Sequence, residues 1–151
     1  MYMRPIIISI TFFLVIFLTQ ISFAEEFLML KNNKVNVRYG PSFEHPIKYV
    51  YLKKYLPIKI IDKKENFRRI IDHKHNSGWI HTSQLKKSSS VILTENQFIF
   101  NKPTQFSKPI AVAKKGKLIL ISKCKDNWCK TKNESISGWL LFNNFWGKLP
   151  N

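Results

Sequence analysis

A cysteine pair is the clearest candidate for chemistry in the sequence. Cys124 and Cys129 flank a turn at residues 125–127, between two segments of strand-like composition. A metal site would need further Cys or His residues at ligand spacing, and a redox pair normally has C-x-x-C spacing beside a helix N-terminus. Hairpin pairing can bring the two side chains together, so in an exported chain we expect a structural disulfide. Closing so short a loop contributes on the order of 2 kcal/mol in the chain-entropy model.

The loop at residues 72–77 is a second candidate. His73 and His75 could lie on one side of a strand and, with Asp72, form a nominal transition-metal site. No further ligand from elsewhere in the chain can be argued, and loops tolerate exposed histidines freely. We therefore predict no metal site and no cofactor.

The acidic residues show no pattern typical of a catalytic site. They fall in polar turns or strand ends beside Lys or Asn, where solvated carboxylates are expected: Glu44, Asp62, Glu65, Asp72, Glu95, Asp126 and Glu134. No Ser/His/Asp or Cys/His set falls on matching strand ends, and a disulfide would remove both cysteines as nucleophiles. We expect a protein that is not an enzyme.

Aromatic residues and one arginine in the first half of the chain form the candidate ligand site. A small β-domain buries only ~60% of its chain surface, so it cannot hide every aromatic residue of this region, Tyr49 and Tyr51 included. The planar guanidinium of Arg38 suits a ligand carboxylate; the alternative is that it tethers a loop by donating to backbone carbonyls. A tight turn, with positive φ at Gly40, would hold Arg38 beside the bound ligand. The predicted ligand-binding residues are Arg38, Tyr39, Gly40, Pro41, Phe43, Tyr55 and Trp79.

Short apolar runs separated by Asn, Gly, Pro and Lys clusters predict an all-β fold with almost no helix. In the first half we expect strands at 27–30, 35–38, 47–52, 58–63, 67–72 and 78–81. In the second half we expect them at 91–94, 97–100, 110–113, 117–123, 128–131 and 138–141. The spacing is typical of small barrels or sandwiches.

The two strand sets align as two copies of one unit. Residues 35–37 match 98–100 at an offset of 63, 58 and 60 match 119 and 121 at 61, and Gly78-Trp79 match Gly138-Trp139 at 60. We predict a domain at 25–87, a linker at 88–90 and a second domain at 91–151. Trp146, beyond the last predicted strand, is expected to pack across the domain boundary.

Residues 1–24 have the order of regions of a secretory signal peptide. Arg4 precedes an uncharged apolar run at 5–18, and Ser22 and Ala24 supply small residues before a cleavage site between Ala24 and Glu25. The alternative is an uncleaved membrane anchor, although the run is shorter than the ~20 residues of a spanning helix. We predict export to the periplasm.

The chain is strongly basic, with 25 Lys+Arg against 9 Asp+Glu and a net charge of +16. The preference for Lys over Arg can reflect genomic base composition, but this does not explain the deficit of acids. Such a surface is attracted weakly to anionic lipid headgroups and acidic wall polymers. Nucleic acid would bind by the same electrostatics, but the predicted compartment excludes it as the physiological partner.

Several motifs resemble the bacterial SH3-like (Src-homology-3-like) domain family. NVRYGPS at 36–42 is similar to the opening of these domains, and Gly78-Trp79-Ile80 to their closing step. Residues 124–129, 138–140 and 145–147 resemble the companion unit of small exported proteobacterial proteins with two such domains. The resemblance covers about 27–149. It departs at Phe67, where the family has Trp, and at 101–103, which lack the Arg-x-Gly-Pro signature.

The resemblance implies two tandem small SH3-like β-barrels that follow the signal peptide. It further suggests peptidoglycan stem peptides as the ligand of an envelope protein. We expect this protein to be a monomer and not an enzyme. An adaptor for another envelope protein is the alternative, and a cationic binder of membrane surfaces is a weaker one. Because the opening signature is intact only in the first copy, we place the ligand site there.

Overall fold

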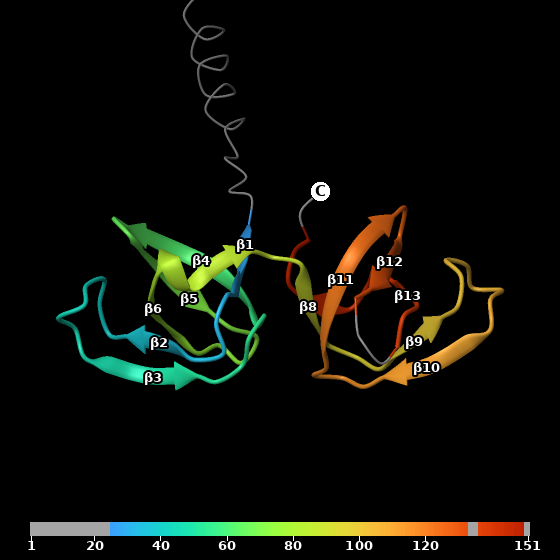
Figure 1. Ribbon diagram of the computed structural model, residues 1–151, viewed down its shortest axis with the longest axis horizontal. Helices are drawn as coiled ribbons and strands as arrows, with labels where there is room; N and C mark the ends of the chain where they lie inside the picture. The colour runs from blue at the N-terminus through green and yellow to red at the C-terminus, as the bar shows by residue number, and fades with distance from the viewer. Residues whose placement is uncertain (1–24, 133–135, 150–151) are drawn as a thin grey trace, which may run out of the picture.

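The computed structural model describes residues 25–132 and 136–149 and consists of two lobes that lie side by side (Figure 1). The first lobe contains β1 (Glu26–Leu30), β2 (Val35–Arg38), β3 (Ile47–Tyr51), β4 (Pro57–Lys64), β5 (Phe67–Ile71), β6 (Ser77–His81), a 3-10 turn η1 (Thr82–Gln84) and β7 (Leu85–Lys87). The second contains β8 (Ser90–Leu93), β9 (Gln97–Phe100), β10 (Pro109–Ala113), β11 (Leu118–Lys125), β12 (Trp128–Thr131), β13 (Trp139–Leu141) and β14 (Phe145–Trp146).

The predicted all-β, two-unit fold is confirmed. Each lobe is an antiparallel seven-stranded sheet, ordered β3-β2-β6-β5-β4-β1-β7 in the first and β10-β9-β13-β12-β11-β8-β14 in the second. Every predicted strand is present, with ends that differ by at most two residues. The short strands β7 and β14 were not predicted. No helix within the described ranges has the length and hydrophobicity needed to cross a membrane.

Alternation along the strands decides which side chains face the core. In β2, Val35 and Val37 are buried and Asn36 is exposed. In β6, Gly78 and Ile80 point inward, so the side chains of Trp79 and His81 lie on the outer face. The same alternation holds in β9, where Ile99 is buried and Phe98 is exposed.

The strand register corrects the predicted alignment of the two copies. Arg38 pairs with Trp79 in the first sheet, and Phe100 pairs with Trp139 in the second, so β2 and β9 align at an offset of 62. The predicted offset of 63 is wrong for this strand. Apolar residues occupy both faces of β9, so hydrophobicity alone does not fix its phase, and a shift by one residue exchanges inward and outward positions.

Each lobe has its own core, but the first core is completed by the second domain. The buried cluster of the first lobe, which includes Ile58 and Ile70, contains Ile92 from β8. Leu118 and Trp146 also pack against it. The Trp146 ring makes an edge contact with Phe27, with centroids 5.4 Å apart, so the expected packing of Trp146 across the boundary is confirmed.

The segment between the domains is buried. Ser88 and Ser90 are 1% and 0% exposed, and Ser90 already belongs to β8. The Ser90 hydroxyl donates to the backbone carbonyl of Tyr55 at 2.6 Å. The serines assigned to the linker therefore form part of the packing between the two domains.

Candidate functional site

The outer face of the first domain carries a cavity of about 320 Å³. Strand β2 and the residue before it, the loop that follows β2, the start of β5, the end of β6 and the η1 turn all contribute to it. Its lining residues are Lys34, Asn36, Arg38, Phe43, Phe67, His81, Ser83 and Gln84. We call this the β2–η1 cavity.

Three rings form the apolar part of the β2–η1 cavity. Phe67 contacts Phe43 and His81, with centroid separations of 5.2 and 5.1 Å, and Phe43 lies 5.0 Å from His81. Phe67 is 5% exposed, whereas Phe43 is 65% exposed. The cavity therefore has a fixed aromatic wall at Phe67 and an aromatic rim that a ligand could cover.

Arg38 lies at the junction of this aromatic group and the loop 39–46. Its Nη1 donates to the carbonyls of Phe43 at 3.1 Å and His45 at 2.7 Å, and its Cζ lies 5.5 Å from the Phe43 ring centroid. Arg38 thus tethers the loop, which was the alternative to ligand binding. Within the described ranges Nη2 and Nε form no hydrogen bond, so the same guanidinium can still donate to a ligand.

The loop 39–46 is closed by its own polar contacts. The Tyr39 amide donates to the Pro46 carbonyl at 3.2 Å, and the Ser42 hydroxyl lies 2.8 Å from His45 Nδ1. The expected positive φ at Gly40 is wrong; only Gly116 and Gly147 have it among the described glycines. Glycine fits at position 40 without displacing a neighbour, whereas a Cβ atom would lie 2.3 Å from the exposed His45 ring and push it aside.

The structure brings together only part of the predicted ligand-binding set. Arg38 and Phe43 line the β2–η1 cavity, and Pro41 and Gly40 belong to the loop beside it. Tyr39 does not line the cavity; it is 63% exposed, and the Lys48 ammonium lies 5.7 Å from its ring centroid. Tyr55 lies at the domain boundary instead.

Trp79 is on the outer face and pairs with Arg38 across the sheet, but it does not line the cavity. The predicted set missed the other lining residues, which are Lys34, Asn36, Phe67, His81, Ser83 and Gln84. Alternation could have found Asn36, because it lies between two buried valines and on the same strand face as Arg38.

The second domain has a cavity at the equivalent place and of the same size, about 320 Å³. Its lining residues are Asn96, Gln97, Phe98, Phe100, Gln105, Trp128, Leu141, Asn143 and Asn144. With offsets of 62 to 60, all eight lining positions of the β2–η1 cavity have a counterpart among these residues. We call it the β9–β13 cavity.

The two cavities differ in chemistry. Lys34, Arg38 and His81 of the first are replaced by Asn96, Phe100 and Leu141 in the second. The β9–β13 cavity is therefore lined by aromatic, aliphatic and amide groups without a charged side chain. Only the first domain can offer a guanidinium and an ammonium to an anionic ligand at this place.

One family of known domains matches this chain twice, once over each of the two sheets of identical strand order. The family model described as "Bacterial SH3 domain" matches residues 31–87 and 94–147. The chain belongs to the bacterial SH3 domain family. It contains two such SH3 domains in tandem, and no curated protein matches it.

Solved structures of larger proteins are similar to the tandem SH3 domains. NlpC2 and NlpC1 from Trichomonas vaginalis are 14% and 13% identical, with a TM-score of 0.37 for each, over 83% and 86% of this chain. An NlpC/P60 family protein from Bacillus cereus is 10% identical, with a TM-score of 0.38 over 80% of this chain. The chain spans about half the length of these structures, covering 49%, 48% and 56% of them.

The predicted disulfide is present in the second SH3 domain. Cys124 and Cys129 are direct partners across β11 and β12, with Cα atoms 4.1 Å apart, and their sulfurs are bonded. Cys129 is fully buried in the core of that domain, and Cys124 is exposed. The disulfide thus links the hairpin tip to the core.

Asp72 in the first SH3 domain is not the solvated carboxylate that the sequence predicted. It is 2% exposed and accepts hydrogen bonds from Tyr51, the Lys74 amide and both the amide and the side chain of Asn76. Burial would raise the pKa of Asp72, but the hydrogen bonds from Asn76, Tyr51 and Lys74 outweigh it and hold the pKa below its usual value.

The tyrosines near Asp72 are structural. Tyr49 and Tyr51 pack against the first core, and burial together with the contact between them raises the pKa of Tyr51. The sequence analysis counted both tyrosines among the aromatic residues around the ligand site, but neither lines the β2–η1 cavity. Residues 25–132 and 136–149 contain no group of three Cys, His, Asp or Glu residues that could hold a metal.

Proposed function

We propose that this protein binds peptidoglycan stem peptides through the β2–η1 cavity and catalyses no reaction. The observation that carries the proposal is the placement of Lys34, Arg38 and His81 around the Phe43–Phe67 wall. A stem peptide offers free carboxylates and a short extended backbone. Membership of the bacterial SH3 family supports a cell-wall ligand of this kind.

In this proposal Arg38 binds a carboxylate of the stem peptide. A guanidinium can donate two parallel N–H bonds to a carboxylate, and the Arg38 fork keeps Nη2 and Nε for this purpose while Nη1 holds the loop. Lys34, in the same cavity, adds a second positive charge. The ligand backbone then crosses the exposed face of Phe43, which gains apolar contact area.

The protein is proposed to act outside the cytoplasm. Disulfides persist in oxidising compartments, and the Cys124–Cys129 bond fits that environment. The proposed signal peptide, with cleavage after Ala24, lies outside the described residues, which begin at Glu25. Intact-mass measurement of the exported form tests this proposal. A mass that begins at Glu25 supports it, and retention of residues 1–24 supports the membrane-anchor alternative.

A pull-down on purified sacculi with a salt titration tests the function. Groove recognition predicts binding that survives high salt and is competed by soluble stem peptide. Arg38→Ala should weaken binding by about 1–3 kcal/mol. Arg69→Ala is the matched control because Arg69 carries the same charge on an exposed site outside the cavity.

Three results would contradict the proposal. Equal losses from Arg38→Ala and Arg69→Ala, or binding abolished by salt, would leave only non-specific charge attraction. Release of soluble fragments from the sacculi would indicate an enzyme. Absence of binding to sacculi, with capture of a defined envelope protein that Arg38→Ala abolishes, would favour the adaptor alternative.

A further inference from the structure

We propose that the cleft between the two SH3 domains is a separate binding site for phosphate-bearing anions. The cleft encloses about 670 Å³ and is larger than either outer-face cavity. Tyr55 lines it from the first domain, and the other residues come from the second: Leu120, Ser122, Lys123, Lys130, Thr131, Lys132 and Ser137. The two domains share core residues, and this packing places the two walls of the cleft side by side.

Three lysines concentrate positive charge in the cleft. Lys123 and Lys130 are direct partners across β11 and β12, and Lys132 lies at the end of the same strand pair. Like charges in directly opposed positions of a β-ladder are destabilising. The ion pairs within the described ranges are Lys59–Glu25 and Lys63–Glu26, so none of the three cleft lysines belongs to one.

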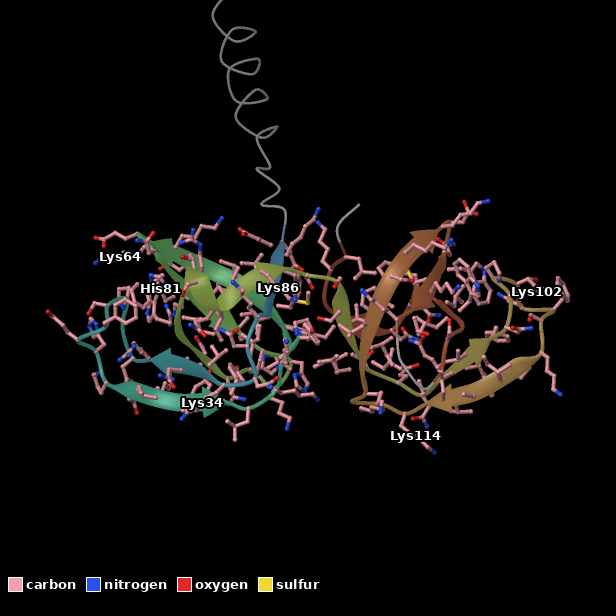
Figure 2. All side chains as sticks on the ribbon, viewed as in Figure 1. Lys34, Lys64, His81, Lys86, Lys102 and Lys114 are labelled. Carbon is pink, nitrogen blue, oxygen red and sulfur yellow. A yellow bond between two sulfur atoms is a disulfide. The ribbon has the colours of Figure 1, made fainter. Side chains whose placement is uncertain are left out.

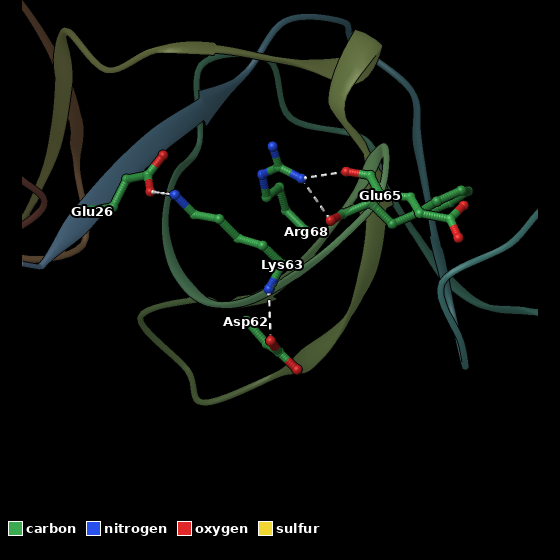
Figure 3. A network of polar contacts seen from close by, with 6 residues as sticks. Glu26, Asp62, Lys63, Glu65 and Arg68 are labelled. Carbon is green, nitrogen blue, oxygen red and sulfur yellow. Dashed lines mark hydrogen bonds and ion pairs between the residues drawn. The ribbon is translucent and has the colours of Figure 1, made fainter.

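In the first SH3 domain the equivalent pair of residues carries opposite charges, so its net charge is zero. Asp62 and Arg69 are direct partners across β4 and β5, and at an offset of 61 they correspond to Lys123 and Lys130. Lys63, beside this pair, forms an ion pair with Glu26 (Figure 3). The repeated fold therefore accommodates opposite charges here, and only the domain that faces the cleft carries two positive ones.

Tyr55 forms the wall of the cleft that belongs to the first domain, and its backbone has an uncommon conformation. It has a φ of 65°, a left-handed conformation that in the second domain is taken by Gly116 with a φ of 79°. The Ser90 hydroxyl and the Leu30 carbonyl hold its backbone. The ammonium groups of Lys54 and Lys86 lie 5.0 and 4.5 Å from its ring centroid. Two further cations thus lie against the Tyr55 ring beside the cleft, although neither lysine lines it.

This charge arrangement favours a phosphate group over a carboxylate. A phosphate has three or more acceptor oxygens and can carry a double negative charge, so one group can bridge the two opposed lysines. Lysine ammonium groups bind phosphate as point charges and do not need the planar geometry of a carboxylate. A lipid headgroup and a soluble phosphorylated glycan share this chemistry.

Titration calorimetry of the purified protein with inorganic pyrophosphate tests the site. We expect one pyrophosphate per chain, and about tenfold weaker binding in Lys123→Gln/Lys130→Gln. Lys114→Gln/Lys115→Gln removes the same charge from the turn before Gly116, outside the cleft, and should change the affinity by less than about twofold (Figure 2). Equal weakening by both double variants, or no pyrophosphate binding, would overturn the proposal.

A second variant should raise the stability of the protein while it lowers pyrophosphate binding. Lys130→Glu recreates opposite charges across the ladder, as Asp62 and Arg69 have them, so it should raise the Tm of the unliganded protein while it abolishes pyrophosphate binding. A variant that retained pyrophosphate binding would overturn the proposal.

Vesicles distinguish the source of the phosphate. Binding to phosphatidylglycerol vesicles that pyrophosphate competes away supports a lipid headgroup, and pyrophosphate binding without vesicle binding supports a soluble ligand. Sacculus binding by Lys123→Gln/Lys130→Gln should equal that of the unaltered chain, because the β2–η1 cavity is intact. This control separates failure of the cleft site from failure of the proposed function.

Discussion

At the scale of single residues, the contact between Gly40 and the His45 ring shapes the loop that Arg38 holds. Gly40→Ala would place a Cβ atom 2.3 Å from that ring. The exposed ring can rotate away, but it then loses the Ser42 hydroxyl at 2.8 Å. We expect the free energy of unfolding to fall by about 1 kcal/mol in Gly40→Ala, measured by urea denaturation.

The same substitution made in a His45→Ala background provides the control. Without the ring, the added methyl group meets no obstacle, so the second step should change the free energy of unfolding by less than about 0.5 kcal/mol. An equal loss in both backgrounds would show that position 40 is restricted by its backbone and not by His45.

Asp72 links the stability of the first domain to pH. Its folded pKa lies below the unfolded value of 3.8, so its stabilising effect is fully present above that value and is lost as pH falls through the lower folded pKa. Asp72→Ala leaves the Tyr51 hydroxyl and the backbone amides of Lys74 and Asn76 without their acceptor. We expect a loss of about 2–3 kcal/mol in the free energy of unfolding at neutral pH.

The pH dependence distinguishes charge from shape. The difference in unfolding free energy between the unaltered chain and Asp72→Asn should shrink as the pH is lowered below about 4. Denaturation series across this range measure it. A difference that stays constant with pH would mean that Asp72 acts through its shape and not through its ionised form.

At the scale of elements, the disulfide crosslinks the β11–β12 hairpin, whereas its counterpart β4–β5 has no crosslink. Cys124→Ala opens the bond at its exposed end and should lower the free energy of unfolding by about 2 kcal/mol, while the ladder keeps the fold. Cys129→Ala should cost more, because Cys129 is fully buried in the second core.

Alkylation without reductant checks the oxidation state directly. The unaltered protein should gain no mass, because both thiols are consumed in one bond. Two labelled thiols in the unaltered protein would contradict the disulfide.

Strand positions could be predicted because each one is a short apolar run bounded by turn residues. The strands β7 and β14 could not, because Leu85–Lys87 and Phe145–Trp146 are too short to show alternation. The phase of β9 was misassigned because Gln97 is buried where the first copy has Val35, while the apolar Phe98 faces outward. A polar residue in the core hides the pattern that would have fixed the register.

Only part of the candidate site could be predicted, because sheet pairing brings some of its residues together from distant parts of the sequence. Arg38 lies in the motif at 36–42 and Phe43 follows it directly, so the two were found together. His81 enters the β2–η1 cavity through sheet pairing, from a strand that is far away in sequence. Tyr55, by contrast, lies close to the motif in sequence but faces the other domain. Sequence proximity predicted a shared site for these residues, and the sheet order separated them.

At the scale of the whole molecule, the shared core should make the two domains unfold together. Ile92 belongs to the second domain in sequence but is 2% exposed within the first core. Ile92→Ala should lower the free energy of unfolding by about 2–4 kcal/mol. Amide hydrogen exchange should show faster opening at Ile58 and Ile70 in the first domain as well as in β8 itself.

Ile61→Ala is the matched control because Ile61 is 45% exposed on the first domain. It removes the same atoms without opening the shared core, so exchange should change little. Faster exchange confined to the second domain in Ile92→Ala would show that the domains open independently.

The contribution of Trp146 to the first core has a consequence for biosynthesis. The first SH3 domain is complete as a sheet at Lys87, yet Ile92, Leu118 and Trp146 are still missing when a ribosome has reached that point. A nascent chain that emerges N-terminus first therefore cannot finish packing its first domain until Trp146 of the second domain has been added.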